Sequence, residues 1–159
     1  MAGFVPLHVS ILQKKLFVIV GPTAVGKTAL SIALAKHLGT EIVSADSRQV
    51  YREMELGTAK PSADELGEVR HHFINSHSIY QDFNAGQYER EAYPVLESLF
   101  KIHDAVVMVG GSGLYIKAVL DGFDEIPEVP DDIREAIDKQ YAEQGIGWLQ
   151  TELARLDPD

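Results

Sequence analysis

The chain has 159 residues, of which 45% are apolar, so its length and composition suit a single globular domain. It has no cysteine, which excludes a disulfide framework and a cysteine-based zinc site, and no run of about 18 apolar residues that would span a membrane. Its formal charge is −10, and residues 81–159 carry 17 Asp and Glu against 6 Lys and Arg, so the totals show no basic excess for gripping nucleic acid.

The first 46 residues alternate between strand and helix patterns. Residues 1–15 contain polar side chains and no small-residue cleavage site, so we expect no signal peptide and a cytoplasmic protein. The apolar run 16–20 predicts a buried parallel strand, and residues 26–38 have helical spacing. Residues 41–45 predict a second strand, which ends at Asp46.

The middle of the chain continues the alternation. Residues 71–74 predict a weaker strand. Asn84 is a suitable N-cap for a helix that runs to about Lys101, although Pro94 predicts a kink or a later start. Residues 105–109 form the clearest buried strand.

The C-terminal third predicts two more helices. Residues 114–120 are expected to be helical, and 121–132 to form a loop. Asp131 or Asp132 would cap a last helix that begins near Ile133. The alternation predicts an α/β fold: one P-loop, kinase-like domain over residues 1–159, with a parallel sheet covered by helices on both faces. The chain ends without a clear closing element, and we expect it to be truncated there.

A phosphate-binding loop follows the first predicted strand. It matches the pattern G-x-x-x-x-G-K-[ST] in Gly21, Pro22, Thr23, Ala24, Val25, Gly26, Lys27 and Thr28. In such a loop, backbone N–H groups and a helix N-terminus surround a phosphate, the lysine adds a full charge, and the last hydroxyl is available to Mg²⁺. The alternative is a glycine-rich turn with a surface lysine.

The loop predicts a diphosphate or triphosphate ligand but not a kinase. Many ATPases end a strand in an acid that helps to hold Mg²⁺, whereas the strand 105–109 ends in Gly110 and Gly111. Asp46 is therefore the candidate acid. Because parallel sheets bind ligands at the carboxyl ends of their strands, we expect the P-loop, Asp46 and residues 110–113 to converge.

Five sequence blocks together resemble the tRNA dimethylallyltransferase family. They are Gly21–Ala24, Ser44–Tyr51, Gly57–Pro61, the pair His71 and His72, and Val109–Tyr115. They occur in the family's order and spacing, and they are more specific together than the P-loop alone. The resemblance implies a P-loop core that transfers a dimethylallyl group from dimethylallyl diphosphate to the exocyclic amine of the adenosine 3′ of the anticodon in tRNA.

The resemblance also implies residue roles. Thr23 to Thr28 would hold the diphosphate with Mg²⁺, which Thr28 would help to bind. Asp46 would be the general base, and Thr23 and Lys27 would belong with it to the catalytic set. The residues that would contact the tRNA anticodon stem-loop are Asp46, Ser47, Arg48, Gln49, Ser112 and Arg134.

Two residues depart from the family pattern. Ser112 stands where threonine is usual, which keeps the hydroxyl, and Asn75 stands where aspartate usually follows the paired histidines. The family also continues beyond residue 159 with basic, helical segments that grip tRNA. We therefore expect an amino-terminal portion of a monomeric enzyme that has no contact with a membrane and is itself inactive or weakly active.

Other interpretations remain open from the residues alone. Asp46 would also suit a helix cap, and a structural role for both His71 and His72 is favoured. Glycines 110, 111 and 113 would suit a tight turn without a ligand, and Arg48 and Arg134 would suit a solvated surface.

Three other functions also stay open. They are a small-molecule or nucleotide kinase, prenylation of free adenine nucleotides, and a non-catalytic nucleotide-binding domain.

Overall fold

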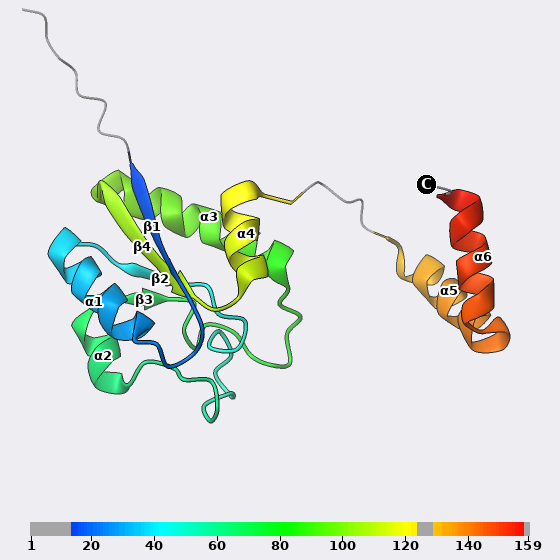
Figure 1. Cartoon of the computed structure of the whole chain (residues 1–159), viewed down its shortest axis with the longest axis horizontal. Coiled ribbons are helices and arrows are strands. Elements are labelled where there is room, and N and C mark those ends of the chain that lie inside the picture. The colour runs from blue at the N-terminus through cyan, green and yellow to red at the C-terminus, as the bar shows by residue number, and fades with distance from the viewer. Residues whose placement is uncertain (1–13, 124–128, 158–159) are drawn as a thin grey trace, which may run out of the picture. The chain divides into compact units, whose positions relative to one another are not determined.

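The computed structural model describes residues 14–123 and 129–157 of the chain. The chain divides into two compact units, one up to Phe123 and one from Asp124, where the sequence predicted a single domain. The first unit contains the sheet and the P-loop, and the second contains two helices (Figure 1).

The first unit is built on a four-stranded parallel sheet. Its strands are β1 (Lys15–Val20), β2 (Ile42–Ser44), β3 (His71–His72) and β4 (Ala105–Gly110), in the spatial order β1-β4-β2-β3. All three pairings are parallel, which confirms the predicted sheet. The third strand is only two residues long, shorter than its sequence pattern predicted.

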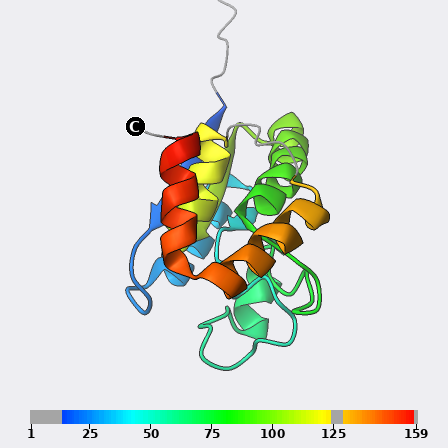
Figure 2. The ribbon, with the colours of Figure 1, turned by 90° about the vertical axis from the view of Figure 1, so that its right-hand side faces the viewer.

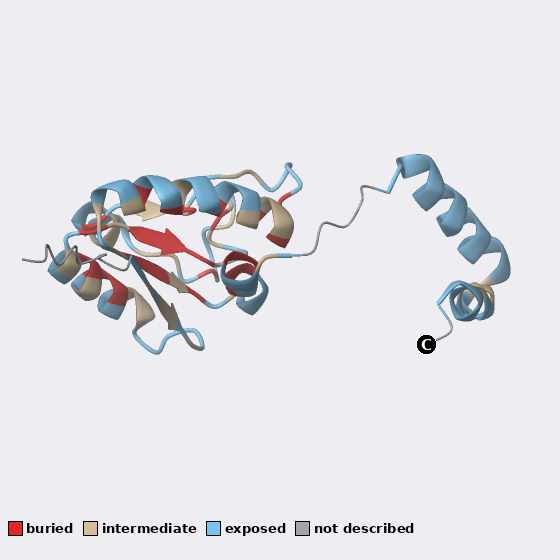
Figure 3. Ribbon diagram, turned by 90° about the horizontal axis from the view of Figure 1, so that it is seen from above, coloured by how far each residue is buried: buried red, intermediate tan, exposed pale blue. Residues whose placement is uncertain are grey.

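Helices cover both faces of this sheet (Figure 3). One face packs against α1 (Lys27–Leu38) through Ile32, Ala35, Ile42 and Val107. The other packs against α3 (Ala85–Ile102) and α4 (Gly113–Asp121). Successive strand side chains point to opposite faces, so the continuous apolar run of β4 serves both layers. The predicted α/β architecture is confirmed.

Capping residues set the starts of two helices. Asn84 caps α3 as predicted, in a reciprocal capping box with Gln87. Pro94 neither delays nor ends α3: the helix continues past it because Pro94 lies on the exposed side, while Ala92, Leu96 and Leu99 hold the opposite side in the core. A second capping box, between Ser62 and Glu65, starts α2 (Ala63–Glu68), which the sequence analysis did not predict.

The second unit pairs α5 (Asp131–Gln144) with α6 (Ile146–Leu156). Figure 2 shows the two helices joined by a tight turn, at Gly145, whose φ of 73° favours glycine. The prediction that Asp131 or Asp132 caps α5 is wrong, because Pro130 is the N-cap. Both aspartates lie in the first helical turn, where their negative charges interact favourably with the positive end of the helix dipole.

None of the helices in the described ranges has the length and apolar character needed to cross a membrane. In the first unit, the parallel strands direct the segments that follow them to one edge of the sheet. These segments are the P-loop, the stretch after Ser44, the stretch after His72 and the glycines after β4. That edge is where an open parallel sheet binds its ligands.

Candidate active site

A cavity of about 350 Å³ lies at the carboxyl edge of the sheet in the first unit. Its walls come from the P-loop, the first turns of α1, the ends of β2, β3 and β4, and the segment that leads into α2. The lining residues are Thr23, Ala24, Gly26, Lys27, Thr28, Ala29, Ser31, Ser44, Asp46, Gln49, Thr58, Ala59, Pro61, Glu65, His71, Ile74, Val109, Gly110 and Gly111. The three segments predicted to converge therefore do so.

The P-loop has the backbone of an anion site. Gly26 has a φ of 90°, and Ala24 a φ of 66°, a conformation that costs a residue with a β-carbon about 1 kcal/mol or more. Gly26 is also the N-cap of α1 and offers no side chain to the first-turn N–H groups. No acidic residue occupies that turn. These N–H groups and the helix dipole are therefore available to a negatively charged ligand.

Two side chains complete this end of the cavity. The ammonium of Lys27 donates to the carbonyl oxygen of Pro22 at 2.7 Å, so it is folded back over its own loop. Thr28 lies in the first turn of α1 and lines the cavity. Of the predicted diphosphate residues, Gly21, Pro22 and Val25 do not line the cavity, and they shape the loop instead.

Asp46 combines two roles that the sequence left as alternatives. Its Oδ1 accepts hydrogen bonds from the backbone N–H groups of Arg48, at 2.9 Å, and Gln49, at 3.2 Å, so it caps the turn that follows β2. Its other oxygen, Oδ2, lies toward Gly111 on the cavity wall. One carboxylate oxygen therefore fixes the side chain, and the other stays available to a ligand.

The other predicted tRNA-contact residues differ in their surroundings. Gln49 lines the cavity, but its amide donates to the carbonyl oxygens of Thr58 and Ala59 at 3.1 and 3.0 Å, so it fastens the opposite wall. The hydroxyl of Ser112 accepts from the N–H of Ser47 at 2.8 Å and ties the β4 loop to the β2 loop.

The two arginines of that set are both exposed. Arg48 follows Asp46 directly in the first unit. Arg134 lies in α5 of the second unit, so it is not part of the described cavity.

The paired histidines point to different surroundings. His71 lines the cavity, and its Nδ1–H donates to the carbonyl oxygen of Val69 at 2.8 Å. Its Nε2 is buried without a hydrogen-bond partner among the described residues. His72 instead contacts the carboxylate of Glu41 at 2.6 Å. Alternation along the short strand β3 explains why only His71 reaches the cavity.

Asn75, one of the two residues that depart from the expected family pattern, accepts a hydrogen bond from Lys60. Lys60 donates to Asn75 Oδ1 and to the carbonyl oxygen of Tyr51, both at 2.6 Å. The amide oxygen therefore accepts from the Lys60 ammonium without carrying a negative charge. Lys60 and Gln49 together hold the segment 58–61 that forms the cavity wall.

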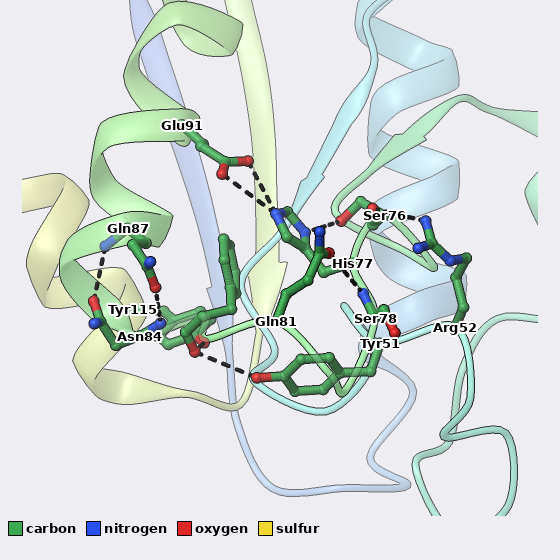
Figure 4. Close-up of polar contacts among 11 residues, drawn as sticks. Tyr51, Arg52, Ser76, His77, Ser78, Gln81, Asn84, Gln87, Glu91 and Tyr115 are labelled. Carbon is green, nitrogen blue, oxygen red and sulfur yellow. Dashed lines mark hydrogen bonds and ion pairs between the residues drawn. The ribbon is translucent and has the colours of Figure 1, made fainter.

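A second network anchors the segment after Asp46 to α3 (Figure 4). His77 donates its backbone N–H to Val50 and accepts from the N–H of Arg52, and its imidazole Nε2 lies 3.3 Å from the Glu91 carboxylate. The hydroxyl of Tyr51 donates to the carbonyl oxygen of Phe83 at 3.3 Å. These contacts hold the β2 loop, and with it Asp46, against the packed core.

Sequence analysis missed the wall formed by α2 and the residues before it. Thr58, Ala59, Pro61 and Glu65 line the cavity although none was a predicted site residue. The Ser62–Glu65 capping box is a sequence signal that would have revealed the helix start. No local pattern reveals that this helix turns back toward the P-loop.

His71 predicts a pH dependence of stability. Burial lowers its pKa in the folded protein, although the Val69 hydrogen bond and the charge of Glu65 oppose that shift. As the pH falls to about 6.5, the ordinary pKa of histidine, His71 becomes protonated in the unfolded chain before it does so in the folded protein. His71 leaves stability unaffected above that pH and lowers it as the pH falls through it.

We therefore expect the unfolding free energy of the wild type to fall more steeply with acidification from about pH 7.5 to 5.5 than that of His71→Gln. Urea denaturation at each pH measures both slopes. Parallel slopes for the two proteins would show that His71 titrates normally in the fold.

Comparison with known proteins places these features in one family. The family model described as IPP transferase matches residues 49–159. The tRNA dimethylallyltransferase of Flavobacterium johnsoniae is 52% identical over 147 residues, which are 92% of this chain and 48% of that protein. That of Cytophaga hutchinsonii is 45% identical over 150 residues, 94% of this chain and 49% of that protein. The chain thus spans about half the length of these relatives.

Solved structures agree with the sequence relatives. The tRNA isopentenylpyrophosphate transferase of Bacillus halodurans is 37% identical, with a TM-score of 0.68 over 92% of this chain and 49% of that one. A eukaryotic dimethylallyltransferase acting on tRNA is 25% identical, with a TM-score of 0.76 over 92% of this chain and 37% of its own. Because the family model covers more than half of the residues and both kinds of relative agree, the chain belongs to the IPP transferase family.

Proposed function

We propose that the protein transfers a dimethylallyl group from dimethylallyl diphosphate to the exocyclic amine of the adenosine 3′ of the anticodon in tRNA. One observation carries the proposal: a single cavity is lined both by the P-loop and by Asp46, whose Oδ2 lies on that wall. An anion site beside a fixed carboxylate suits a reaction between a diphosphate ester and an amine. The names of the relatives, tRNA dimethylallyltransferases, support the choice of substrates.

The P-loop end suits the leaving group. Negative charge builds on the diphosphate as the allylic C–O bond breaks, and the electron pair of that bond leaves with it. The uncapped N–H groups of α1 are in place to stabilise that charge. The Lys27 ammonium, which donates to the Pro22 carbonyl oxygen, would add a full positive charge when it turns to the diphosphate. Thr23, which also lines the cavity, offers a hydroxyl to the same group.

The Asp46 end suits the nucleophile. The lone pair of an adenine amine is delocalised into the ring, so the amine attacks carbon only weakly. As its nitrogen forms the new N–C bond, one N–H proton must leave, and Asp46 Oδ2 can accept it. The hydrogen bonds from Arg48 and Gln49 to Oδ1 keep the carboxylate oriented for that transfer.

Mg²⁺ fits the residues at the P-loop. Among residues 14–123 and 129–157, no three histidine, cysteine or carboxylate side chains form a metal cluster. Mg²⁺ commonly needs none, because it keeps several waters and binds one or two protein oxygens together with substrate phosphates. The Thr28 hydroxyl on the cavity wall is such an oxygen. When bound, Mg²⁺ would neutralise part of the diphosphate charge.

The tRNA base would enter from the exposed rim beside Asp46. A target base must leave its stack to reach a cavity of this kind, at a cost of a few kcal/mol. Ser47 and Arg48 are exposed next to Asp46, so they suit contacts to the displaced nucleotide. Ser112 would act through Ser47, and Arg134 would contact tRNA from the second unit.

Residues 81–159 are strongly acidic and would bind RNA phosphates poorly. The other RNA contacts would therefore come from the half of the relatives' length that this chain does not span. A tRNA substrate suits a cytoplasmic enzyme, and we propose that the enzyme acts as a monomer.

The direct test is to incubate the whole protein with labelled dimethylallyl diphosphate, and separately with labelled ATP, each with and without tRNA. Label that enters tRNA only from the prenyl donor supports the proposal. Conversion of ATP to ADP without prenyl transfer would support a kinase instead.

Removal of the Lys27 charge should weaken diphosphate binding. In Lys27→Ala we expect the affinity for Mg²⁺-pyrophosphate to fall about ten- to a hundred-fold, because a charge-assisted contact is lost in a partly dry site. Isothermal titration calorimetry measures the change. Lys36→Ala is the matched control, since Lys36 lies on the same helix but pairs with Glu68 at the surface. Equal affinities for the two variants would contradict an anion site at the P-loop.

A further inference from the structure

The two glycines that end β4 have different surroundings. A β-carbon on Gly110 would lie 2.0 Å from the carbonyl oxygen of Ala45, so the fold itself requires glycine there. Apart from its chain neighbours, the described atoms within 4 Å of a β-carbon on Gly111 are Asp46 Oδ2, at 3.8 Å, and the Gly21 carbonyl oxygen, at 4.0 Å. These are ordinary contact distances, and the φ of Gly111 is not in the left-handed region. Neither backbone conformation nor packing therefore requires glycine at position 111.

The space above Gly111 is part of the cavity. Gly111 and Asp46 both line it, and the ideal β-carbon position falls beside the one carboxylate oxygen that holds no backbone hydrogen bond. A methyl group at position 111 would thus lie against the approach to Oδ2, 3.8 Å from that oxygen and 4.0 Å from the carbonyl oxygen of Gly21.

Amine alkylation needs that space on geometric grounds. The nitrogen must lie about 2.9 Å from Oδ2 to pass on its proton. Its lone pair must at the same time face the allylic carbon, at about 3 to 3.5 Å. The nitrogen must therefore satisfy its distances to Oδ2 and to the allylic carbon at the same time, beside the wall at position 111. A side-chain carbon at that position would occupy space that the amine and its ring need.

We propose that Gly111 is a specificity-determining residue, whose missing side chain keeps the approach to Asp46 Oδ2 open for a primary amine on a planar base. The inference rests on the proposed function, and it explains why glycine stands at a position where the fold would accept alanine. Gly110 is needed for β4 to pack against Ala45, whereas Gly111 leaves room for the reacting amine.

The test compares Gly111→Ala with the wild type and with Gly67→Ala in the whole protein. Gly67 lies in α2, and apart from its chain neighbours and the backbone of its own helix, no atom of the described residues lies within 4 Å of its ideal β-carbon. It is therefore a control for adding a methyl group. Single-turnover prenyl transfer to tRNA, Mg²⁺-pyrophosphate affinity and melting temperature are measured for all three. We expect Gly111→Ala to react about a hundred-fold more slowly, because a displacement of about 1 Å has that effect on an aligned reaction.

The other two measurements separate the causes. Pyrophosphate affinity and melting temperature of Gly111→Ala should match the wild type, and Gly67→Ala should react normally. A normal single-turnover rate in Gly111→Ala would overturn the inference and leave the proposed function intact. A lower melting temperature or weaker pyrophosphate binding would overturn it as well, by giving Gly111 a role in the loop itself. If the wild type transfers no label to tRNA, the proposed function fails, and the inference fails with it.

Discussion

Replacement of Asp46 by asparagine is expected to lower the single-turnover rate constant of prenyl transfer by roughly two to four powers of ten. Asparagine keeps the shape of the side chain, and its amide oxygen can still accept from the N–H groups of Arg48 and Gln49. The group that faces the cavity changes from a carboxylate oxygen, which accepts a proton, to an amide that cannot. The capping role survives, and the proton acceptor is lost.

Three measurements on Asp46→Asn distinguish the roles of this residue. If Asp46 is the base, the rate falls while Mg²⁺-pyrophosphate affinity and melting temperature stay near the wild-type values. If it only caps the turn, the variant loses about 1 kcal/mol of stability or less and keeps its rate. If it binds metal, Mg²⁺-dependent diphosphate affinity falls together with the rate. Asp104→Asn, at a surface ion pair with Lys14, is the matched control. Near-normal chemistry in Asp46→Asn would remove Asp46 from the catalytic set.

The second large effect concerns folding. We expect Gly110→Ala to lose more than about 3 kcal/mol of stability, because the new β-carbon would lie 2.0 Å from the oxygen and 2.5 Å from the carbonyl carbon of Ala45. Neither strand can move aside easily. Ala45 donates its N–H to Val109 at 2.8 Å and accepts from Ser112 at 3.2 Å, so the clash falls inside the pairing of β2 with β4.

Urea denaturation of Gly110→Ala, compared with Gly67→Ala, measures this loss. The contrast with Gly111→Ala is informative because the two substitutions are adjacent, yet we expect one to act on folding and the other on chemistry. A wild-type midpoint for Gly110→Ala would mean that β2 and β4 separate at little cost.

The residues alone predicted the core of the site because its signals are local. The P-loop pattern needs a strand before it and a helix after it, and the apolar run before Gly21 and the helical spacing after Gly26 supplied both. Asp46 was found because it directly follows the predicted strand 41–45, which forms as Ile42–Ser44, and parallel strands bring such positions to one edge. The Asn84 capping box likewise marked the start of α3.

The sequence was a weaker guide where a position depends on distant contacts. A strand was predicted over residues 71–74, but its short length was not, because only His71 and His72 pair with the neighbouring strand, at Ile42 and Val43. The position of α2 beside the cavity also depends on residues that are distant along the chain. So does the role of Gln49, whose amide donates to the carbonyl oxygens of Thr58 and Ala59 in the opposite wall. A loop was predicted over residues 121–132, but that pattern does not show that the residues after it form a second unit.

The sequence by itself determined the phosphate loop, the parallel α/β architecture and the place of Asp46 after a strand, because backbone conformation, side-chain periodicity and strand ends are properties of neighbouring residues. The role of Asp46 as a base was implied only by the family resemblance. Only the tertiary structure decided which oxygen of Asp46 faces the cavity, which histidine lines it, and why Gly110 and Gly111 differ. Each of these depends on atoms that sheet pairing brings within a few ångströms from separate parts of the chain. Such contacts follow from the packing of the whole sheet, and no local sequence pattern encodes them.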